Sequence, residues 1–173
     1  MPQPPPHGKL RDVSADPTRD ILIVLVRADP DYADAAQLIR AYASSLPFAL
    51  DFQGFDREIA DLAAEYGPPT GELLIARRGD EAVGCVGVRA LEWDACEMKR
   101  LYVLPGARGL GVGRMLAVRI IDAARGLGYR RMRLDTIETM DAAMALYRSL
   151  GFVEIPAYYD NPVPGARYFE LVL

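Results

Sequence analysis

The sequence predicts one α/β (α+β) domain, built on a mixed central sheet of about seven strands with about four flanking helices. Three observations support this fold class. Short β-branched runs alternate with segments whose apolar residues recur every three or four positions. The order of these segments is strand, two helices, three strands, helix, strand, helix and two strands. The chain has 173 residues, 51% of them hydrophobic, which is enough for one core of ordinary size.

The first part of the chain divides into a polar lead-in and three regular elements. Residues 1–20 are rich in proline and charge, so we expect a flexible lead-in followed by a single domain over 21–173. β-Branched residues predict a buried strand, and apolar spacing predicts two helices that end at prolines or glycine. These elements are expected at 21–27 (strand), 29–45 (helix) and 55–66 (helix).

The rest of the domain begins with an antiparallel meander, because three strand patterns follow each other through short turns. A glycine-rich stretch then leads into alternating helices and strands. Thr139 is expected to cap one helix, and Gly151 to close it in the left-handed conformation. The expected strands are 72–78, 82–91, 96–104, 130–137, 152–155 and 167–173, and the expected helices are 112–125 and 140–150.

Composition excludes several kinds of chemistry. The one histidine, His7, lies in the lead-in, so His-dependent nucleophilic catalysis and His-ligated zinc have no suitable residue in the domain. Cys85 and Cys96 are too few for a four-cysteine metal site and are expected to be small buried residues. No metal is therefore expected. The longest aliphatic run, 21–26, is too short to span a membrane, so a cytoplasmic protein without a membrane partner is expected.

The net charge of −4 conceals a basic segment. Residues 99–133 contain nine basic residues and one acidic residue, Asp122, so this segment carries +8 and the remainder carries −12. The imbalance indicates that something anionic binds there. A nucleic acid is one alternative, but no basic run interleaved with aromatic residues supports it, and no nucleic-acid partner is expected.

The glycine-rich stretch inside the basic segment carries the most information about chemistry. Gly109, Gly111 and Gly113 separate a strand end from a helix start, where unpaired backbone N–H groups suit a phosphate. Arg108 and Arg114 bracket the stretch and can add charge-assisted hydrogen bonds. A Walker loop is excluded because no Lys-Ser/Thr follows the last glycine, and the Gly-x-Gly-x-x-Gly spacing of a dinucleotide site is missing.

These motifs resemble those of the GNAT family of N-acetyltransferases. Arg108-Gly-Leu-Gly-Val-Gly113 is similar to the family's Arg/Gln-x-x-Gly-x-Gly/Ala signature. Glu97-Met-Lys-Arg-Leu-Tyr-Val103 resembles its central strand, and Leu146-Tyr-Arg-Ser-Leu-Gly-Phe152 resembles a later helical element. The resemblance covers 21–173, including the order of the elements.

The resemblance implies that acetyl-CoA is the acyl donor. The loop amides would hold its pyrophosphate, and the backbone of the preceding strand would pair with its pantetheine arm as an added strand would. Many relatives have asparagine seven residues before the helical tyrosine, where this chain has Met140, so that contact is lost or supplied elsewhere. The expected donor-binding residues are Leu101, Tyr102, Val103, Arg108, Gly109, Leu110, Gly111, Val112, Gly113 and Arg114.

The resemblance also suggests catalytic roles for two residues. Tyr147 would act as general acid for the departing sulfur, although its apolar spacing also fits a core tyrosine. Glu97 would act as base, directly or through water, or else form an ion pair with an arginine or lysine. Strand alternation places Glu97, Lys99, Leu101 and Val103 on one face. A backbone N–H near Val103 would stabilise the oxyanion.

The acceptor is expected to be the primary amine of a small molecule or amino acid, acetylated by direct transfer. The alternative is a CoA-binding sensor or interaction module with a degenerate acceptor site. The sequence leaves a monomer and a homodimer open. Acceptor contacts are expected between the early helices and in the loop before the last strand, from Phe52, Gln53, Phe55, Tyr158 and Tyr159, with Phe48, Asp160 and Asn161 beside them.

Overall fold

A seven-stranded sheet organises the chain in the computed structural model, which describes residues 20–173. The predicted lead-in, apart from Asp20, lies outside the described residues. The strand order is β1-β2-β3-β4-β5-β7-β6, and β2, β3 and β4 form the predicted antiparallel meander. The strands are β1 (Ile21–Leu25), β2 (Glu72–Arg78), β3 (Glu81–Glu92), β4 (Ala95–Val103), β5 (Arg131–Ile137), β6 (Val153–Ile155) and β7 (Ala166–Val172).

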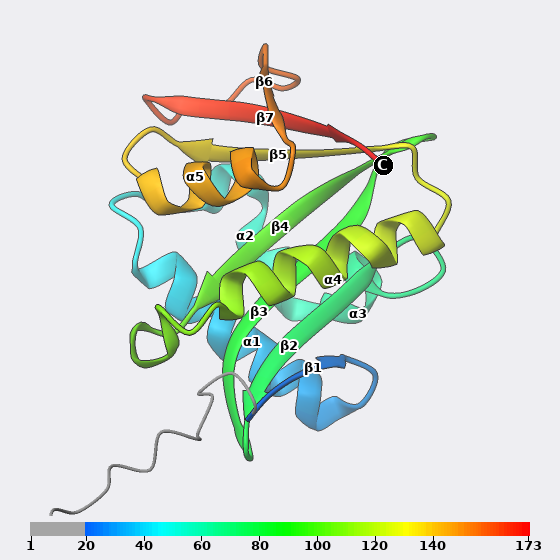
Figure 1. The fold of residues 1–173 in the computed structure, drawn as a ribbon, viewed down its shortest axis with the longest axis vertical. Coiled ribbons are helices and arrows are strands. Elements are labelled where there is room, and N and C mark those ends of the chain that lie inside the picture. Colours follow the sequence, from blue (N-terminus) through cyan, green and yellow to red (C-terminus); the bar gives the residue numbers. More distant parts are fainter. Residues whose placement is uncertain (1–19) are drawn as a thin grey trace, which may run out of the picture.

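Helices cover both faces of the sheet (Figure 1). On one face, α4 and α5 pack over a cluster of buried residues that includes Leu116, Met132 and Phe169. On the other face, α1 and α3 pack over a second cluster that includes Ile39 and Tyr66. The helices are α1 (Asp29–Ser44), α2 (Phe55–Ala60), α3 (Leu62–Tyr66), α4 (Val112–Gly126) and α5 (Asp141–Ser149), with 3₁₀ turns at Asp51–Gln53 and Pro105–Ala107. The mixed sheet between helical layers confirms the predicted fold class.

Two local predictions were wrong in detail. The helix expected over 55–66 is interrupted at Asp61, whose extended backbone (φ −148°, ψ 76°) ends α2. Its carboxylate then caps α3 by accepting the N–H of Ala64 at 2.9 Å. Thr139 is not the cap of α5, which begins after Met140 without a side-chain cap. Gly151 has φ +92°, as expected of the residue that closes this helix.

The strands β4 and β5 separate after a short parallel contact. Their pairing covers only Ala95–Glu97 against Arg131–Arg133. Beyond this contact β5 continues to pair with β7 on its other side, whereas β4 continues to pair with β3. The edges of β4 and β5 that face one another are therefore left open from Met98 and Leu134 onward. Figure 1 shows the two strands diverging between α4 and α5.

A bulge in β4 lies beside this opening. Arg100 has φ +60°, which is unusual for a residue with a side chain, and the register with β3 shifts around it. The predicted alternation of faces fails there. Lys99 and Arg100 both point to the face covered by α1–α3, whereas Leu101 and Val103 pack on the α4 face instead of sharing the face of Glu97. An extra residue in one strand reverses the alternation for all residues that follow it.

The two cysteines are buried in the sheet, as expected, and provide a first prediction. Burial raises the pKa of both the Cys85 and the Cys96 thiol to about 12. Because the thiolate is the reactive form, native protein at about pH 8 should react with a disulfide reagent far more slowly than a free thiol does. Absorbance of the released chromophore measures this, with urea-unfolded protein as the control for full labelling. Rapid labelling of folded protein would contradict the prediction.

Candidate active site

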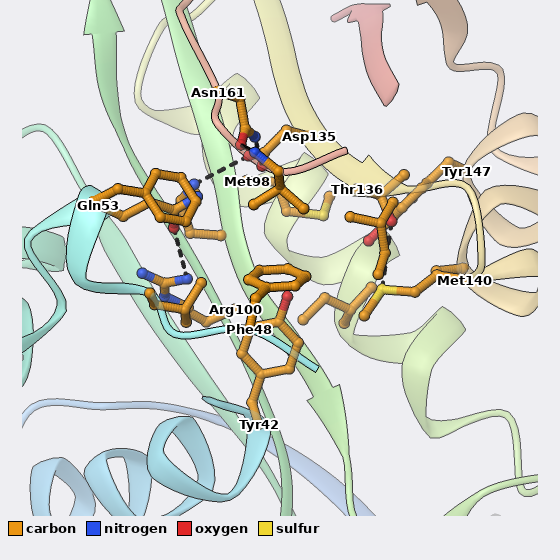
Figure 2. Close-up of a pocket in the computed structure, with 17 residues that line it drawn as sticks. Tyr42, Phe48, Gln53, Met98, Arg100, Asp135, Thr136, Met140, Tyr147 and Asn161 are labelled. Atoms are coloured by element: carbon orange, nitrogen blue, oxygen red, sulfur yellow. Dashed lines mark hydrogen bonds and ion pairs between the residues drawn. The ribbon is translucent and has the colours of Figure 1, made fainter. Parts of the chain in front are cut away.

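A cavity opens where β4 and β5 separate, and elements from both faces of the sheet line it (Figure 2). Gln53 and Arg100 lie on one side of this cavity, and Tyr147 and Met140 lie on the opposite side. We call it the central cavity. Its lining residues are Tyr42, Phe48, Leu50, Phe52, Gln53, Met98, Lys99, Arg100, Leu101, Asp135, Thr136, Ile137, Met140, Ala143, Tyr147, Asn161 and Val163.

In the part of the chain that the structure describes, the backbone N–H groups of 109–114, in the glycine-rich loop and the first residues of α4, have no hydrogen-bond partner. Gly109 (φ +78°) and Gly111 (φ +74°) adopt the left-handed conformation, and a Cβ at either position would meet no atom within 4 Å. Met115 donates its N–H to the Gly111 carbonyl at 3.0 Å and is the first residue of α4 to bond back to the loop. The open space at the two glycines and the backbone amides of 109–114 suit a phosphate, and we call this part of the loop the phosphate cradle.

The two arginines that bracket the loop are held by the protein itself. Arg108 donates from Nε to the Val103 carbonyl at 3.0 Å, so it fixes the end of β4 against the loop. Arg114 donates to the Ser149 hydroxyl at 2.9 Å, which connects α4 to α5. Within residues 20–173 neither forms an ion pair, so both guanidinium groups keep an uncompensated charge near the loop.

Most of the other charges in the basic segment are neutralised locally. Five of its nine cations form ion pairs, mainly with acids from other parts of the chain. The +8 of the segment is therefore not presented as one basic surface. Among residues 20–173, its four cations without an ion pair are Arg108 and Arg114 at the loop, Arg119 within α4 and Arg130 before β5. The paired cations are Lys99, Arg100, Arg125, Arg131 and Arg133.

The open edge of β4 offers hydrogen-bonding groups to an extended ligand. Leu104 donates its N–H to the Val83 carbonyl of β3 at 2.9 Å. Successive N–H groups of a strand point to opposite edges, so those of Leu101 and Val103 point to the open edge. Tyr102, between them, packs on the opposite face, where its ring lies 5.8 Å from the Arg108 guanidinium.

Tyr147 reaches the central cavity from α5. Its ring packs against Phe152 and Phe169, with centroids at 5.8 and 6.3 Å, so the residue is also part of the core. Burial raises the pKa of its hydroxyl well above the ordinary tyrosine value. The group therefore keeps its proton at neutral pH, which a general acid requires.

Glu97 lies in β4 and is almost fully buried. Its Oε2 accepts two hydrogen bonds from Arg89, at 2.9 and 3.1 Å, and its Oε1 accepts the Tyr158 hydroxyl at 2.8 Å. Lys99 Nζ lies 3.7 Å away. The ion pair that the sequence offered as an alternative role is present. Glu97 lines a separate hollow beside Tyr158 and Tyr159, rather than the central cavity.

The structure adds a carboxylate that the sequence analysis missed. Asp135 of β5 lines the central cavity and pairs with Lys99 at 3.1 Å. Its Oδ2 accepts the Tyr159 hydroxyl at 2.9 Å, and the Asn161 amide lies at 3.5 Å. Asp135 follows the basic segment on a strand that alternates basic and apolar residues, and this change of charge was the available signal.

The predicted acceptor contacts separate into two groups. Phe52 and Gln53 line the central cavity, together with Phe48. Tyr158 and Tyr159 line the neighbouring hollow, which also contains Phe52 and Gln53. Phe55 lies outside both, and the Arg100 guanidinium stacks 5.6 Å from its ring centroid. Met140 lines the central cavity and accepts the Thr136 hydroxyl on its sulfur at 3.5 Å.

Over residues 20–173, no group of three or more His, Cys, Asp or Glu residues is arranged to hold a metal ion. Within the same range, no helix has the length and apolar character needed to cross a membrane.

The chain is similar to known proteins in sequence and in fold. Residues 35–152 match the family model described as Acetyltransferase (GNAT) family. A Schizosaccharomyces pombe protein described as an uncharacterized N-acetyltransferase is 42% identical over 156 residues, covering 88% of this chain and 94% of that protein. An Escherichia coli protein with the same description is 32% identical over 126 residues, covering 69% of this chain and 75% of that protein. The crystal structure of an acetyltransferase from Streptococcus agalactiae superposes with a TM-score of 0.75 at 22% identity, covering 90% of this chain and 99% of that chain.

Proposed function

Because the chain belongs to the GNAT family of acetyltransferases, we propose that it transfers an acetyl group directly from acetyl-CoA to the primary amine of a small molecule or amino acid. One observation carries the proposal. The start of α4 lies beside β4 and α5, because a Cβ at Gly113 would lie 3.7 Å from the Val103 side chain and 3.9 Å from that of Leu146. Leu101 of β4 and Tyr147 of α5 line the central cavity. A donor bound along the open edge of β4 would have its phosphates at α4 and its thioester near Tyr147.

On the donor side, the protein must bind acetyl-CoA and give a proton to its departing sulfur. The amides between Arg108 and Arg114 would hold the pyrophosphate, and the N–H of Val103 would pair with the pantetheine arm. The N–H of Leu101, which also points to the open edge and belongs to a residue lining the central cavity, is the donor we assign to the developing oxyanion. Tyr147 would give its proton to the sulfur as the carbon–sulfur bond breaks. CoA would supply the activated acyl group, and the protein would supply orientation and protons.

The acceptor side must remove a proton, since a free alkylamine is largely protonated at neutral pH. Two carboxylates lie there, the predicted base Glu97 and Asp135, and Lys99 lies between them. An opening beside the central cavity is mostly apolar, so an amine with an uncharged, apolar body would suit it. The opening is lined by Pro47, Phe48, Ala49, Phe52, Ile137, Glu138, Thr139, Pro162, Val163 and Pro164.

A screen for release of free CoA thiol tests the proposed function. Purified protein would be incubated with acetyl-CoA and a panel of small primary amines and amino acids, and the acetylated product identified by mass spectrometry. We expect thiol release with at least one primary amine and little with its tertiary analogue. Binding of CoA without acetylation of any amine would favour a sensor instead.

The phosphate cradle gives a separate prediction. Gly111→Asp should weaken acetyl-CoA binding by roughly 100-fold, because a carboxylate at ~5 Å from a phosphate costs about 3 kcal/mol and the left-handed backbone disfavours the side chain. Calorimetry with CoA measures the affinity. The matched control is Gly126→Ala at the end of α4, where an added Cβ meets no atom within 4 Å and affinity should stay unchanged. Equal affinities for the two variants would place the pyrophosphate elsewhere.

A further inference from the structure

Five charged side chains form an alternating row beneath the acceptor side of the site. Arg89 of β3 bonds to Glu65 of α3 and lies 2.9 Å from Glu97 of β4. Lys99 lies 3.7 Å from Glu97 and 3.1 Å from Asp135 of β5. We call this row, Glu65–Arg89–Glu97–Lys99–Asp135, the charge ladder. It crosses three strands and bridges the gap where β4 and β5 separate.

The two ends of the charge ladder differ in their position relative to the central cavity. Glu65 is on α3, away from the central cavity, whereas Asp135 lines that cavity. The ladder has three acids and two bases, so one negative charge has no cationic partner within the row. A cation next to Asp135 would continue the alternation into the cavity. The ammonium group of an acceptor amine has the charge and size for that place.

Glu97 and Asp135 are not equivalent carboxylates. Glu97 is held by two bonds to one guanidinium and has a side chain that is 3% exposed. Within residues 20–173 no arginine bonds to Asp135, and its side chain is 13% exposed. Among the described residues that line the central cavity, Asp135 is the one acidic side chain, and it shares that cavity with Tyr147.

Strand geometry places Asp135 and Tyr147 on opposite sides of the sheet. Met132 and Leu134 pack with α4, so Asp135, next in the alternation, points to the face covered by α1–α3. Tyr147 comes from α5 on the α4 face. The central cavity joins the two faces only because β4 and β5 have separated. An acceptor can therefore approach Asp135 from one face while the donor reaches Tyr147 from the other.

We propose that Asp135 binds the ammonium group of the acceptor and accepts its proton, and that Glu97 is a positioning residue that holds Lys99 and the loop carrying Tyr158. This inference rests on the proposed function and assigns the base within it. One N–H bond of the ammonium breaks toward Asp135, and the electron pair left on nitrogen forms the C–N bond. The π pair of the thioester C=O moves onto oxygen and returns as the C–S bond breaks.

The protons and electrons of the transfer then balance. The C–S bond breaks with its electron pair on sulfur, which takes a proton from Tyr147. A second proton leaves the nitrogen and passes to the Tyr147 oxygen, which restores the phenol that gave its proton to sulfur. The proton on Asp135 passes to water, so one proton is released per turnover.

Several groups face Asp135 and will shape any dependence on pH. They lie on α1, β4, α5, β7 and the loop before β7, and most are tyrosines with pKa values raised first of all by burial. Lys99 is the cation in direct contact. The groups are Tyr42 of α1, Lys99 of β4, Tyr147 of α5, Tyr158, Tyr159 and Asn161 of the loop before β7, and Tyr168 of β7.

The test compares Asp135→Asn with Glu97→Gln, using the best amine from the thiol-release screen. Asp135→Asn should lower kcat/KM by about 100-fold or more and abolish the acidic limb of its pH profile. It should also weaken binding of the tertiary N,N-dimethyl analogue of that amine by about tenfold or more, because the analogue keeps the positive charge. Glu97→Gln should keep the acidic limb. CoA affinity, measured by calorimetry, should be the same in both variants and in the wild type.

The outcomes distinguish failure of the proposed function from failure of the Asp135 assignment. Wild-type protein that releases no thiol with any amine overturns the proposed function, and the assignment of Asp135 with it. An active wild type with an Asp135→Asn variant that keeps its acidic limb, or a Glu97→Gln variant that loses it, overturns only the assignment. If Asp135→Asn does not fold, Tyr159→Phe removes the hydroxyl bonded to Oδ2 and keeps the carboxylate. The acidic limb should then move to higher pH, and an unmoved limb counts against Asp135.

Discussion

Tyr147→Phe should lower kcat by about 10²- to 10⁴-fold, the usual contribution of a positioned general acid. The substitution removes the one oxygen of this side chain and leaves its ring against Phe152 and Phe169. Acetyl-CoA affinity and the melting temperature should therefore change little. Steady-state assays of thiol release give kcat, and calorimetry gives the affinity. A KM effect without a kcat effect would indicate a binding role instead.

The pH dependence of the same reaction gives an independent check of Tyr147. Because burial raises the pKa of its hydroxyl, the proton is retained well into the alkaline range. Turnover by the wild type should therefore show no loss attributable to this group below about pH 10, the ordinary tyrosine pKa. Tyr129→Phe is the matched control, since it removes a tyrosine hydroxyl that bonds to the Thr70 carbonyl outside the central cavity. A Tyr147→Phe variant as active as Tyr129→Phe would remove the general-acid assignment.

The sequence was sufficient to predict the elements because each one has a clear periodicity. The meander, the helix after the glycines and the final strands follow from local patterns. The interruption at Asp61 was missed because apolar spacing continues across it, from Ile59 to Leu62. The bulge at Arg100 was missed because nothing in Lys99-Arg100-Leu101 breaks a strand pattern. That single residue reversed the predicted faces of Leu101 and Val103.

The candidate site was partly predictable, for a similar reason. The loop from Arg108 to Gly113 and the helix containing Tyr147 are continuous motifs, so their residues can be read together. Lys99 and Asp135 are 36 residues apart and meet only through the register of β4 and β5. Their contact depends on where these strands stop pairing, which a local pattern does not encode. Residues that function across a sheet opening are therefore the ones that a single sequence leaves hidden.

Glu58→Gln should destabilise the fold by about 3–5 kcal/mol, because it leaves Arg100 charged and buried without its partner. Glu58 of α2 accepts two bonds from Arg100, at 2.8 and 2.5 Å, and both side chains are almost fully buried. It also accepts the Tyr66 hydroxyl at 2.7 Å. Arg100 donates further to Gln53 at 3.0 Å, so the pair fixes the bulge in β4 beside the central cavity. Urea unfolding followed by circular dichroism measures the loss.

The pH dependence of this loss distinguishes a broken ion pair from a packing defect. Burial alone would raise the pKa of Glu58, but the hydrogen bonds and charge of Arg100 outweigh it and lower the pKa. A carboxyl whose pKa is lower in the folded state stabilises the protein fully above its unfolded value, about 4.3, and loses that contribution as pH falls through the folded value. The stability difference between the wild type and Glu58→Gln should therefore shrink below about pH 4.3.

Two further variants distinguish the two ways in which Glu58→Gln could destabilise the fold: by leaving a buried charge without a partner, or by removing a packing contact. Asp122→Asn breaks the exposed Asp122–Arg125 pair, of the same chemistry but in water, and should cost less than about 1 kcal/mol. Combining Glu58→Gln with Arg100→Met removes both charges, so the double variant should be more stable than Glu58→Gln alone. If the double variant is less stable than Glu58→Gln, the loss in free energy of unfolding comes from packing at the bulge. The ion pair would then not be the interaction that holds α2 against β4.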